Sequence, residues 1–501
     1  MQYIDGGNIQ FVIVMLVYVA FLISFGIYQG SKVKNGADYA IAGRMLPGWV
    51  AALSERATAE SSWCLLGLPG LSYAMGLSGI WSSMGSFIGI VISWVFIARL
   101  MRRDAEKYEA LTFTDYLGKR FGKMGSAITI FSSWAIVFFF FFYVGAQFIG
   151  GGKTLFTVFD IPVSIAMLAV FFIVLPYTIY GGFGSVVYTD CVQALVMIGA
   201  LVLAPLYGIY YISVTPDVFS HSIWDALSKC PPSFQSWTGA LSGFAALTMI
   251  TGEFSWIFGF LGGLPQLTTR YMAIKDDKEA KLGRNVGILW SFGAYVGAPL
   301  IGLIGIAIFG PTGLADPEMV TPSVFLKMFH PIIASLFLTG AIAAMLSTAD
   351  SLLVLSSTEL SENIIIPYLR KGGREVDLKR SLFISRCATA GVAVGALIAA
   401  YMVPSKLINT VVGYAWAGIG STFSVVILGA LFTKRFNSKA AFATMVTGVF
   451  FTIFWNVCGY EKTIISARAM TFFVSLAVAI VVSLVTEPDE PVSKSSKRTT
   501  H

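Results

Sequence analysis

Apolar stretches long enough to cross a lipid bilayer recur along the whole sequence, and they constrain the fold more than any other feature. A transmembrane helix needs about 20 predominantly apolar residues. Thirteen stretches come close to this length, at residues 9–29, 48–74, 77–98, 125–150, 160–181, 187–212, 238–262, 285–309, 330–357, 381–402, 407–432, 440–457 and 464–485. We therefore predict an all-α polytopic membrane protein with about 13 transmembrane helices.

The composition agrees with a membrane protein and excludes the other broad classes. Of the 501 residues, 56% are hydrophobic and only 12% are charged, whereas a soluble domain is about 25% charged. Intrinsic disorder is excluded because disordered chains are poor in apolar and aromatic residues. The net charge of +7 is not concentrated in a basic run with interleaved aromatic residues, so we expect no nucleic-acid partner.

The distribution of Lys and Arg predicts the orientation in the membrane. Of the 34 basic residues, 26 lie in connections that would share one side, namely 30–47, 99–124, 263–284, 358–380, 433–439 and 486–501. The other side would carry only Lys153, Lys229, Lys327, Lys406 and Lys462. Since cytoplasmic loops are enriched in Lys and Arg, we predict an outside N-terminus and a cytoplasmic C-terminus in a plasma or inner membrane. Residues 1–485 would form one transport domain, and 486–501 a cytoplasmic tail.

Three basic residues fall within the predicted spans. Arg386 and Arg468 lie near span ends, where long side chains can snorkel to the interface. Arg56 is deeper, in the second span, and it is flanked by Glu55 and Glu60. Charges at this depth are costly and mark functional sites by default. One interpretation is a discontinuous helix whose unwound backbone coordinates an ion or a substrate. The alternative is a loop between two half-spans, or an Arg56–Glu60 pair that only packs.

The seventh span carries a second set of interrupting residues, with Glu253 followed by Gly259, Gly262, Gly263 and Pro265. Proline removes a backbone hydrogen bond, so this span is also expected to be broken or kinked. The alternative is that the glycines only let neighbouring helices approach. Spans two and seven are five apart, which predicts a five-plus-five inverted-repeat transporter core with its site at the repeat interface.

The ninth span and the start of the sixth supply oxygen ligands. Ser347 and Ser351 are i,i+4 neighbours on one helix face, and Thr348 and Asp350 lie between them. Hydroxyl and carboxylate oxygens suit a hard cation such as sodium. The hydroxyls could instead bond back to the preceding turn. Asp190, near the cytoplasmic start of the sixth span, could coordinate an ion or be solvated at the interface.

These residues make the chain resemble the sodium/solute symporter family, and within it the sodium/proline symporter branch. Four motifs carry the resemblance, which runs in order from about residue 10 to residue 480. The motifs are Trp63 with Leu65–Gly70, Gly181–Phe183 with Thr189, Asp190 and Gln193, Ala343–Thr348 with Leu352–Val354, and Gly413–Gly418. The resemblance implies sodium-coupled uptake of a small organic solute, with Na⁺ as the co-transported ion.

The resemblance also implies the ligands of two sodium sites and part of a solute site. The principal sodium site would use main-chain oxygens of Ala57, Glu60 and Ala344, with the hydroxyls of Ser347 and Thr348. A second sodium site would match Asp190, Ser347, Asp350 and Ser351. Aromatic contacts to the solute would come from Tyr143 and Trp256, and Trp63 and Arg56 are further candidates.

Two departures from the proline branch bear on the solute. The branch usually carries an aspartate where this chain has Ala59, and small residues where it has Glu55 and Arg56. Arg56 could receive a solute carboxylate bidentately, or it could be held by Glu55 or Glu60. We predict the internal pair, because an unpaired arginine at this depth is costly.

The sequence therefore predicts a sodium symporter for an amino acid such as L-proline. The alternatives are a symporter for pantothenate, a sugar or a carboxylate, and a membrane-embedded sensor. An enzyme is not expected, because no catalytic motif is visible and the three histidines are scattered. The partners expected are the solute, sodium and the lipid bilayer, and the sequence does not indicate an oligomeric state.

Overall fold

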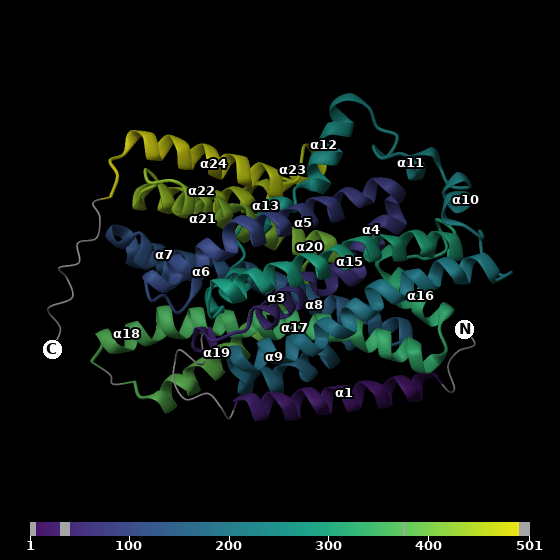
Figure 1. Cartoon of the computed structure of the whole chain (residues 1–501), viewed down its shortest axis with the longest axis horizontal. Coiled ribbons are helices and arrows are strands. Elements are labelled where there is room, and N and C mark those ends of the chain that lie inside the picture. The colour runs from purple at the N-terminus through teal and green to yellow at the C-terminus, as the bar shows by residue number, and fades with distance from the viewer. Residues whose placement is uncertain (1–6, 31–40, 374–375, 490–501) are drawn as a thin grey trace.

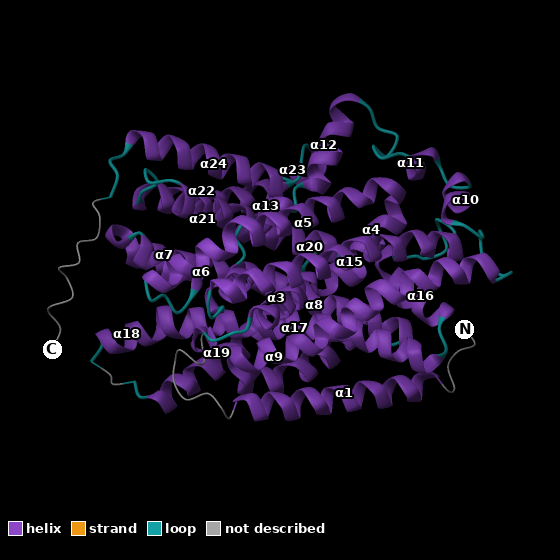
Figure 2. Cartoon of the chain, in the orientation of Figure 1, coloured by secondary structure: helices purple, strands orange, loops and turns teal. Residues whose placement is uncertain are grey.

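The structure is a computed structural model that describes residues 7–30, 41–373 and 376–489 of the chain. The described residues contain helices and connecting loops but no strand, and most of the helices run along the long axis of the body (Figures 1 and 2). The only β-type pairing among them is a single bridge between Leu46 and Ile274. The helical fold class predicted from the apolar stretches is confirmed.

The helices fall into two series along the chain. The first series is α1 Gly7–Gly30, α3 Gly48–Ser62, α4 Leu68–Met75, α5 Ile80–Ile92, α6 Ala98–Lys107, α7 Phe113–Arg120, α8 Gly125–Phe159, α9 Val163–Val214, α10 Ile223–Ser228, α11 Pro232–Gln235, α12 Gly243–Phe254, α13 Ile257–Phe260 and α14 Pro265–Ala273. The second is α15 Asp277–Phe309, α16 Val320–Met328, α17 Pro331–Leu360, α18 Ile366–Lys371, α19 Leu378–Met402, α20 Ile408–Ala415, α21 Thr422–Phe432, α22 Ser438–Val457, α23 Tyr460–Thr463 and α24 Ala467–Val485. π-helical turns occupy Trp63–Gly67, Ser93–Ile97, Ser361–Ile365 and Trp416–Ser421.

Several helices have a side-chain hydrogen bond at the N-cap residue. Asp276 accepts the N–H of Glu279 at the start of α15, and Asn437 accepts that of Ala440 at the start of α22. Such a cap satisfies one of the backbone donors that a helix leaves open at its N-terminus. The proline at the first position of α17, Pro331, has no N–H to satisfy.

Ten helical stretches among the described residues are long and apolar enough to span a membrane. One of them, 48–107, covers two of the thirteen predicted spans, and two further apolar helices, Ile9–Leu22 and Val163–Pro176, are shorter. The count of thirteen stays a prediction. The predicted fifth and sixth spans form one helical element, α9, of 52 residues. A straight helix of that length would extend about 78 Å, more than twice the hydrocarbon thickness of a bilayer.

Helix α17 lies inside the bundle, where it packs against α1, α3, α8, α9 and α19 (Figure 1). Its side chains from Phe337 to Val354 are buried, including the polar ones. A helix buried on nearly all sides can hold polar groups only if neighbouring helices bond to them. The arrangement therefore places the hydroxyl-rich segment of the ninth span against the interrupted second span.

Helix α3 ends at a break in the second span, as predicted. Ser61 has φ of 50° and ψ of −165°, which is strained for a residue with a side chain. Two backbone donors at the break bond to side chains, and that of Trp63 also donates to the carbonyl oxygen of Glu60. The N–H of Ser62 donates to Gln147 of α8 at 2.9 Å, and the N–H of Trp63 donates to the hydroxyl of Ser61 at 3.1 Å. The unwound backbone is thus satisfied by side chains, which is how irregular backbone persists at membrane depth.

The predicted interruption of the seventh span is also confirmed. The segment is divided into α12, α13 and α14, and Gly262, in the second gap, has φ of 89°. A side chain on Gly263 would lie 2.1 Å from the carbonyl oxygen of Gly420, so only glycine fits there. The N–H of Gly263 donates to Ser424 at 3.0 Å. The glycines therefore lie at a break in the helix and also allow the close approach of a neighbouring helix. Both interpretations of this span, a broken helix and close helix packing, are correct.

The two ends of the body carry different connections. Helices α6, α7 and α18 lie at one end, and α10, α11 and α16 lie at the opposite end (Figure 1). Two of the connections that were predicted from their basic residues to share one side, 99–124 and 358–380, contain these first three helices and lie at the same end. The chain termini, residues 1–6 and 490–501, lie outside the described residues. Most of the predicted tail is among them, so the orientation and the tail stay predictions.

Three basic residues are not where the sequence placed them. Arg270, expected in a cytoplasmic loop, is 1% exposed within α14. Lys153, expected on the outer side, is 2% exposed within α8. Arg468, expected to snorkel, is 5% exposed near the start of α24. The exposed positions expected for them were wrong, whereas the side of the membrane assigned to Arg270 and Lys153 stays a prediction. For Arg270 the reason is that a polar helical segment buried by the protein itself has the hydropathy of a loop.

Candidate functional site

The predicted principal sodium ligands meet between α3 and α17. The hydroxyl of Ser347 lies 3.3 Å from the carbonyl oxygen of Ala57 and 2.9 Å from that of Ala344. The hydroxyl of Thr348 lies 3.1 Å from the carbonyl oxygen of Thr58 and 3.0 Å from that of Ala344. Five oxygens from two helices therefore converge just before the break at Ser61. Oxygens of this kind suit a hard cation.

The hydroxyls of this cluster bond both within their own helix and across to α3. The back-bonding alternative is therefore correct for Ala344, but it does not describe the contacts with Ala57 and Thr58. The carbonyl oxygen of Glu60 accepts the N–H of Trp63 in the structure. Thr58, which the sequence did not single out, supplies the carbonyl that faces Thr348. Glu60 as a main-chain ligand stays a prediction.

The predicted second sodium site is a buried cluster around Asp190. Its carboxylate accepts hydrogen bonds from Ser54 at 2.6 Å, from Thr58 at 3.3 Å and from Arg270 at 3.0 Å. Asp190 is fully buried, so the solvated interface alternative is wrong. Ser351 accepts a hydrogen bond from Arg270 at 2.7 Å, which links α17 to the same cluster. In this conformation a guanidinium occupies the position of a cation beside Asp190.

The remaining predicted ligand of that site, Asp350, is fully buried on α17 next to Ser351. The two clusters share α17, on which Ser347 and Ser351 are one turn apart, and they share α3 through Thr58, whose carbonyl and hydroxyl face different clusters. The hydroxyl of Thr58 lies 3.2 Å from that of Ser351. The two clusters therefore form one continuous polar seam between α3 and α17, with Asp190 of α9 bonded to it through Thr58.

The aromatic residues predicted for the solute site form a cluster beyond the break. The rings of Trp63 and Trp256 are 4.2 Å apart between centroids, and Trp416 is within 5.4 Å of Trp256 and 6.1 Å of Tyr143. All four side chains are buried. The indole N–H of Trp256 has no hydrogen-bond partner among the described residues, although buried polar atoms are nearly always paired. A cluster of this kind presents apolar faces with a few polar atoms, which suits a small organic solute.

Arg468 forms the outer wall of this cluster. Its guanidinium lies 4.2 Å from the ring centroid of Trp256. It donates to the hydroxyl of Ser255 and to the carbonyl of Gly252, both at 3.0 Å. The guanidinium therefore covers one face of the indole. This contact could not be predicted from the sequence, because Arg468 is more than two hundred residues away along the chain.

Gly259 is expected to be essential for the geometry of the aromatic cluster. A Cβ atom at this position would lie 1.9 Å from the indole nitrogen of Trp416, which donates to the carbonyl of Trp256 at 3.2 Å. Because Trp416 is fully buried and cannot move aside freely, Gly259→Ala should destabilise the protein by about 1–3 kcal/mol. The solute concentration for half-maximal uptake should rise as well. Thermal unfolding and uptake kinetics measure the two effects, with Gly391→Ala, where a Cβ meets nothing within 4 Å, as the control.

Arg56 is held by the two glutamates. Its guanidinium donates to both carboxylate oxygens of Glu55 and, at 3.0 Å, to Glu60. A further bond of 3.2 Å reaches the hydroxyl of Ser291. All three charged side chains are fully buried. The structure therefore has the internal pairing, and a contact between Arg56 and a solute stays a prediction.

A further buried ion pair, Lys153–Glu318, is linked to the aromatic cluster through α20. Lys153 of α8 bonds to Glu318 at 2.6 Å and to Asp316 at 2.7 Å. Glu318 also accepts the N–H of Ile408 at 2.9 Å and that of Asn409 at 3.1 Å, at the start of α20. Asn409 in turn accepts the indole N–H of Trp63 at 3.0 Å. The loop between α15 and α16 is thereby tied to the aromatic cluster through a chain of hydrogen bonds.

The fold and the site together define a secondary transporter with two interrupted helices. A family model described as the sodium:solute symporter family matches residues 39–448. The chain therefore belongs to the sodium:solute symporter family, as its motifs indicated. Membership identifies it as a transporter of the multi-pass membrane type, with sodium as the co-transported ion.

Two curated relatives are similar over nearly the whole chain. The osmoregulated proline transporter OpuE of Bacillus subtilis is 32% identical over 484 residues, which is 96% of each chain. The high-affinity proline transporter PutP of the same organism is 32% identical over 476 residues, covering 94% of this chain and 98% of the relative.

Two solved structures share the fold. A sodium-coupled sialic acid symporter has a TM-score of 0.76 at 19% identity, covering 96% of this chain and 99% of that one. The nucleobase-cation-symport transporter Mhp1 has a TM-score of 0.52 at 13% identity, covering 89% and 92%. These likenesses confirm the predicted class of fold, an all-helical transporter core.

Proposed function

We propose that this protein is a sodium/proline symporter, which uses inward sodium flow to drive uptake of L-proline. The observation that carries the proposal is the polar seam between α3 and α17, where hydroxyl and carbonyl oxygens converge just before an aromatic cluster. The two similar curated relatives are proline transporters, which supports the choice of solute. Proline is small and largely apolar, and its ring suits contact with the faces of Trp63, Trp256 and Tyr143.

The seam explains how sodium could act on the solute site. In the structure, the hydroxyls of Ser347 and Thr348 donate to carbonyl oxygens across the seam. A sodium ion would make all these oxygens ligands, so the hydroxyl protons would turn away and α3 would be held to α17 by charge. This fixes the break at Ser61 and with it the position of Trp63. Coupling then follows, because each ligand raises the affinity for the other by the same factor.

The cluster around Asp190 supports a second sodium ion as part of the proposal. In the present conformation Arg270 occupies it and bonds to Ser351. A sodium ion at Asp190, Ser351 and Asp350 would compete with this guanidinium, so release of Arg270 would accompany occupation of the site. Each sodium moved inward gains about 2.3 kcal/mol per 100 mV of membrane potential.

The orientation is proposed from the basic residues. Helices α6, α7 and α18, which carry many of them, would face the cytoplasm, and α10, α11 and α16 would face outward. The N-terminus would then be outside and the C-terminus cytoplasmic. Residues 1–485 would act as one transport domain.

The test of the function is uptake of labelled L-proline into proteoliposomes with and without an inward sodium gradient. We expect uptake above the equilibrium level only with the gradient, and faster uptake when the interior is negative, because net positive charge moves with the solute. A potassium gradient of equal size is the control. Proline uptake that ignores sodium would contradict the proposal, and a panel of pantothenate, sugars and carboxylates would then identify the solute.

A further inference from the structure

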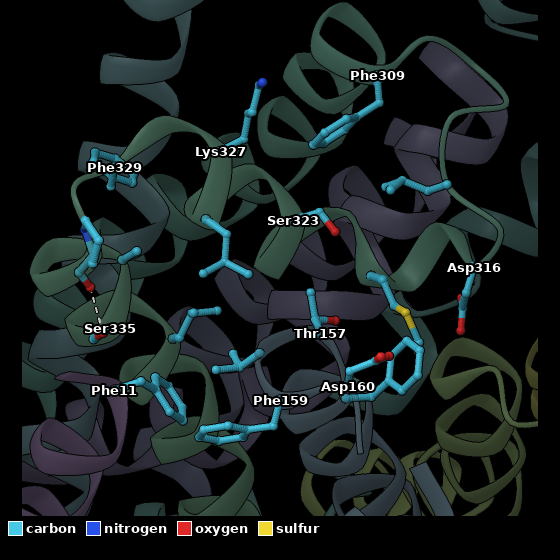
Figure 3. A pocket seen from close by; sticks show the side chains of 18 of the residues that line it. Phe11, Thr157, Phe159, Asp160, Phe309, Asp316, Ser323, Lys327, Phe329 and Ser335 are labelled. Atoms are coloured by element: carbon cyan, nitrogen blue, oxygen red, sulfur yellow. Dashed lines mark hydrogen bonds between the residues drawn. The ribbon is translucent and has the colours of Figure 1, made fainter. Parts of the chain in front are cut away.

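A large cavity lies at the end of the bundle that carries α16, away from the proposed transport site. Its volume is about 800 Å³, within the range of sites that hold small organic ligands. Figure 3 shows Phe11 and Phe159 together on one side, with Phe309 and Phe329 on the other. The rings of Phe11 and Phe159 meet edge to face at 5.4 Å. Most of the lining side chains are aliphatic or aromatic, so the cavity favours an apolar occupant.

The cavity is separate from the polar seam and from the aromatic cluster. None of the residues proposed to bind sodium or the solute lines it. Its walls come from the beginning of α1, the end of α8, the end of α15, the α16 segment and the beginning of α17. Apart from α16 and the loop 313–316 before it, these are helix ends, so the cavity lies toward one end of the bundle.

Side chains beside the cavity face the lipid. Ile9 and Ile13 of α1 flank the lining residue Phe11 and are 64% and 55% exposed. Ile332 and Leu336 of α17, beside the lining residues Pro331 and Ser335, are 54% and 49% exposed. Large exposed apolar side chains on transmembrane helices contact acyl chains. The apolar lining of the cavity is therefore bordered on two sides by a lipid-facing surface.

The charged side chains that line the cavity are those of Asp160, Asp316 and Lys327. Asp316 is paired with Lys153 at 2.7 Å, and Asp160 is exposed to solvent beyond the end of α8. Lys327 has no ion pair and no hydrogen bond from its ammonium group among the described residues. In Figure 3 its ammonium lies at the edge of the cavity and points away from Phe11 and Phe159. A half-buried lysine at the membrane surface is placed to bind an anionic headgroup.

We propose that this cavity binds a glycerophospholipid from the surrounding leaflet, with an acyl chain among the phenylalanines and the phosphate on Lys327. The lipid would enter from the exposed surfaces of α1 and α17 without leaving the membrane. Its chain would pack against α16, whose preceding loop carries Glu318. The bound lipid would thus support the segment that is tied to the start of α20.

The test is photo-crosslinking of the full-length protein in proteoliposomes that contain a phosphatidylglycerol with a diazirine near the end of one acyl chain. We expect adducts on peptides that contain Phe11, Leu326 and Leu338, mapped by mass spectrometry. Ala334→Trp should lower their yield at least about fivefold, because the indole takes the space of the chain. Met319→Trp fills the same cavity from the opposite wall and should act alike, which guards against misfolding of either variant.

Matched variants separate this site from general lipid contact. Val394→Trp, at a position 46% exposed on α19, should leave the adducts unchanged. Lys327→Glu should lower the yield, whereas Lys229→Glu, at a half-exposed lysine of the same end, should not. With a diazirine diacylglycerol, which has the acyl chains but no phosphate, Lys327→Glu should leave the adduct yield unchanged. Adduct yields in both filled variants equal to that of the unmodified protein, or equal effects of the two lysine variants, would overturn the proposal.

Discussion

Replacing Ser347 or Thr348 by alanine should raise the sodium concentration for half-maximal uptake by roughly 10- to 100-fold, while the protein stays folded. Each hydroxyl is one of five oxygens that converge between α3 and α17. A hydrogen-bonding or coordinating contact to a charged partner contributes about 1.5–3 kcal/mol, and 1.4 kcal/mol is a tenfold change in affinity. The loss of the neutral hydrogen bond in the absence of sodium is smaller, about 1 kcal/mol.

The measurement is the sodium dependence of solute uptake at saturating solute. Ser357→Ala is the matched control, because Ser357 is buried on the same helix and its hydroxyl donates back to Val354 in the preceding turn, at 2.9 Å. It should leave the sodium requirement unchanged. Thr348→Ser keeps the hydroxyl and should recover most of the affinity. If both alanine variants kept the sodium dependence of the unmodified protein, the proposed ion site would be wrong.

The broken helices could be predicted because their causes are local in sequence. Gly262, Gly263 and Pro265 disturb a helix wherever they occur, and charges such as Arg56 stand out in an apolar span. The hydroxyls of α17 were found for a similar reason, since Ser347 and Ser351 are one helical turn apart. Local signals thus identified the elements that form the site, although not which atoms meet.

The partners of the predicted residues could not be found in this way. Asp190 and Arg270 bond across 80 positions of sequence, and Arg270 follows the apolar run in a polar stretch that has the pattern of a loop. That stretch is α14, in which all nine residues are buried. Hydropathy measures the affinity of a segment for lipid. It therefore does not detect a polar helix that is enclosed by other helices and does not contact lipid. The ion pair of Lys153 could not be predicted either, because its partner Glu318 lies 165 positions away along the chain.

Replacing Arg56 alone by glutamine should be strongly destabilising. The change removes the guanidinium that neutralises the buried carboxylates of Glu55 and Glu60. The neutral donors Trp94 and Tyr271 still bond to Glu55, at 3.2 and 3.1 Å, but they carry no positive charge. Removing one partner of a buried ion pair costs about 3–5 kcal/mol. We therefore expect little folded protein and no uptake. The yield of monodisperse protein and its thermal unfolding measure the first effect.

Replacing all three residues by glutamine tests what Arg56 is for. The variant Glu55→Gln/Arg56→Gln/Glu60→Gln keeps similar volumes and hydrogen-bonding groups without buried charge, and such replacements of buried ion pairs are often neutral in stability. We expect the fold to return, and uptake with it at saturating sodium, with the solute KM within about threefold, which is less than 1 kcal/mol of binding. Arg56 then serves only to neutralise its neighbours. A variant that folds but no longer takes up the solute would instead assign Arg56 to the solute carboxylate, because that bidentate contact is the one function glutamine cannot replace.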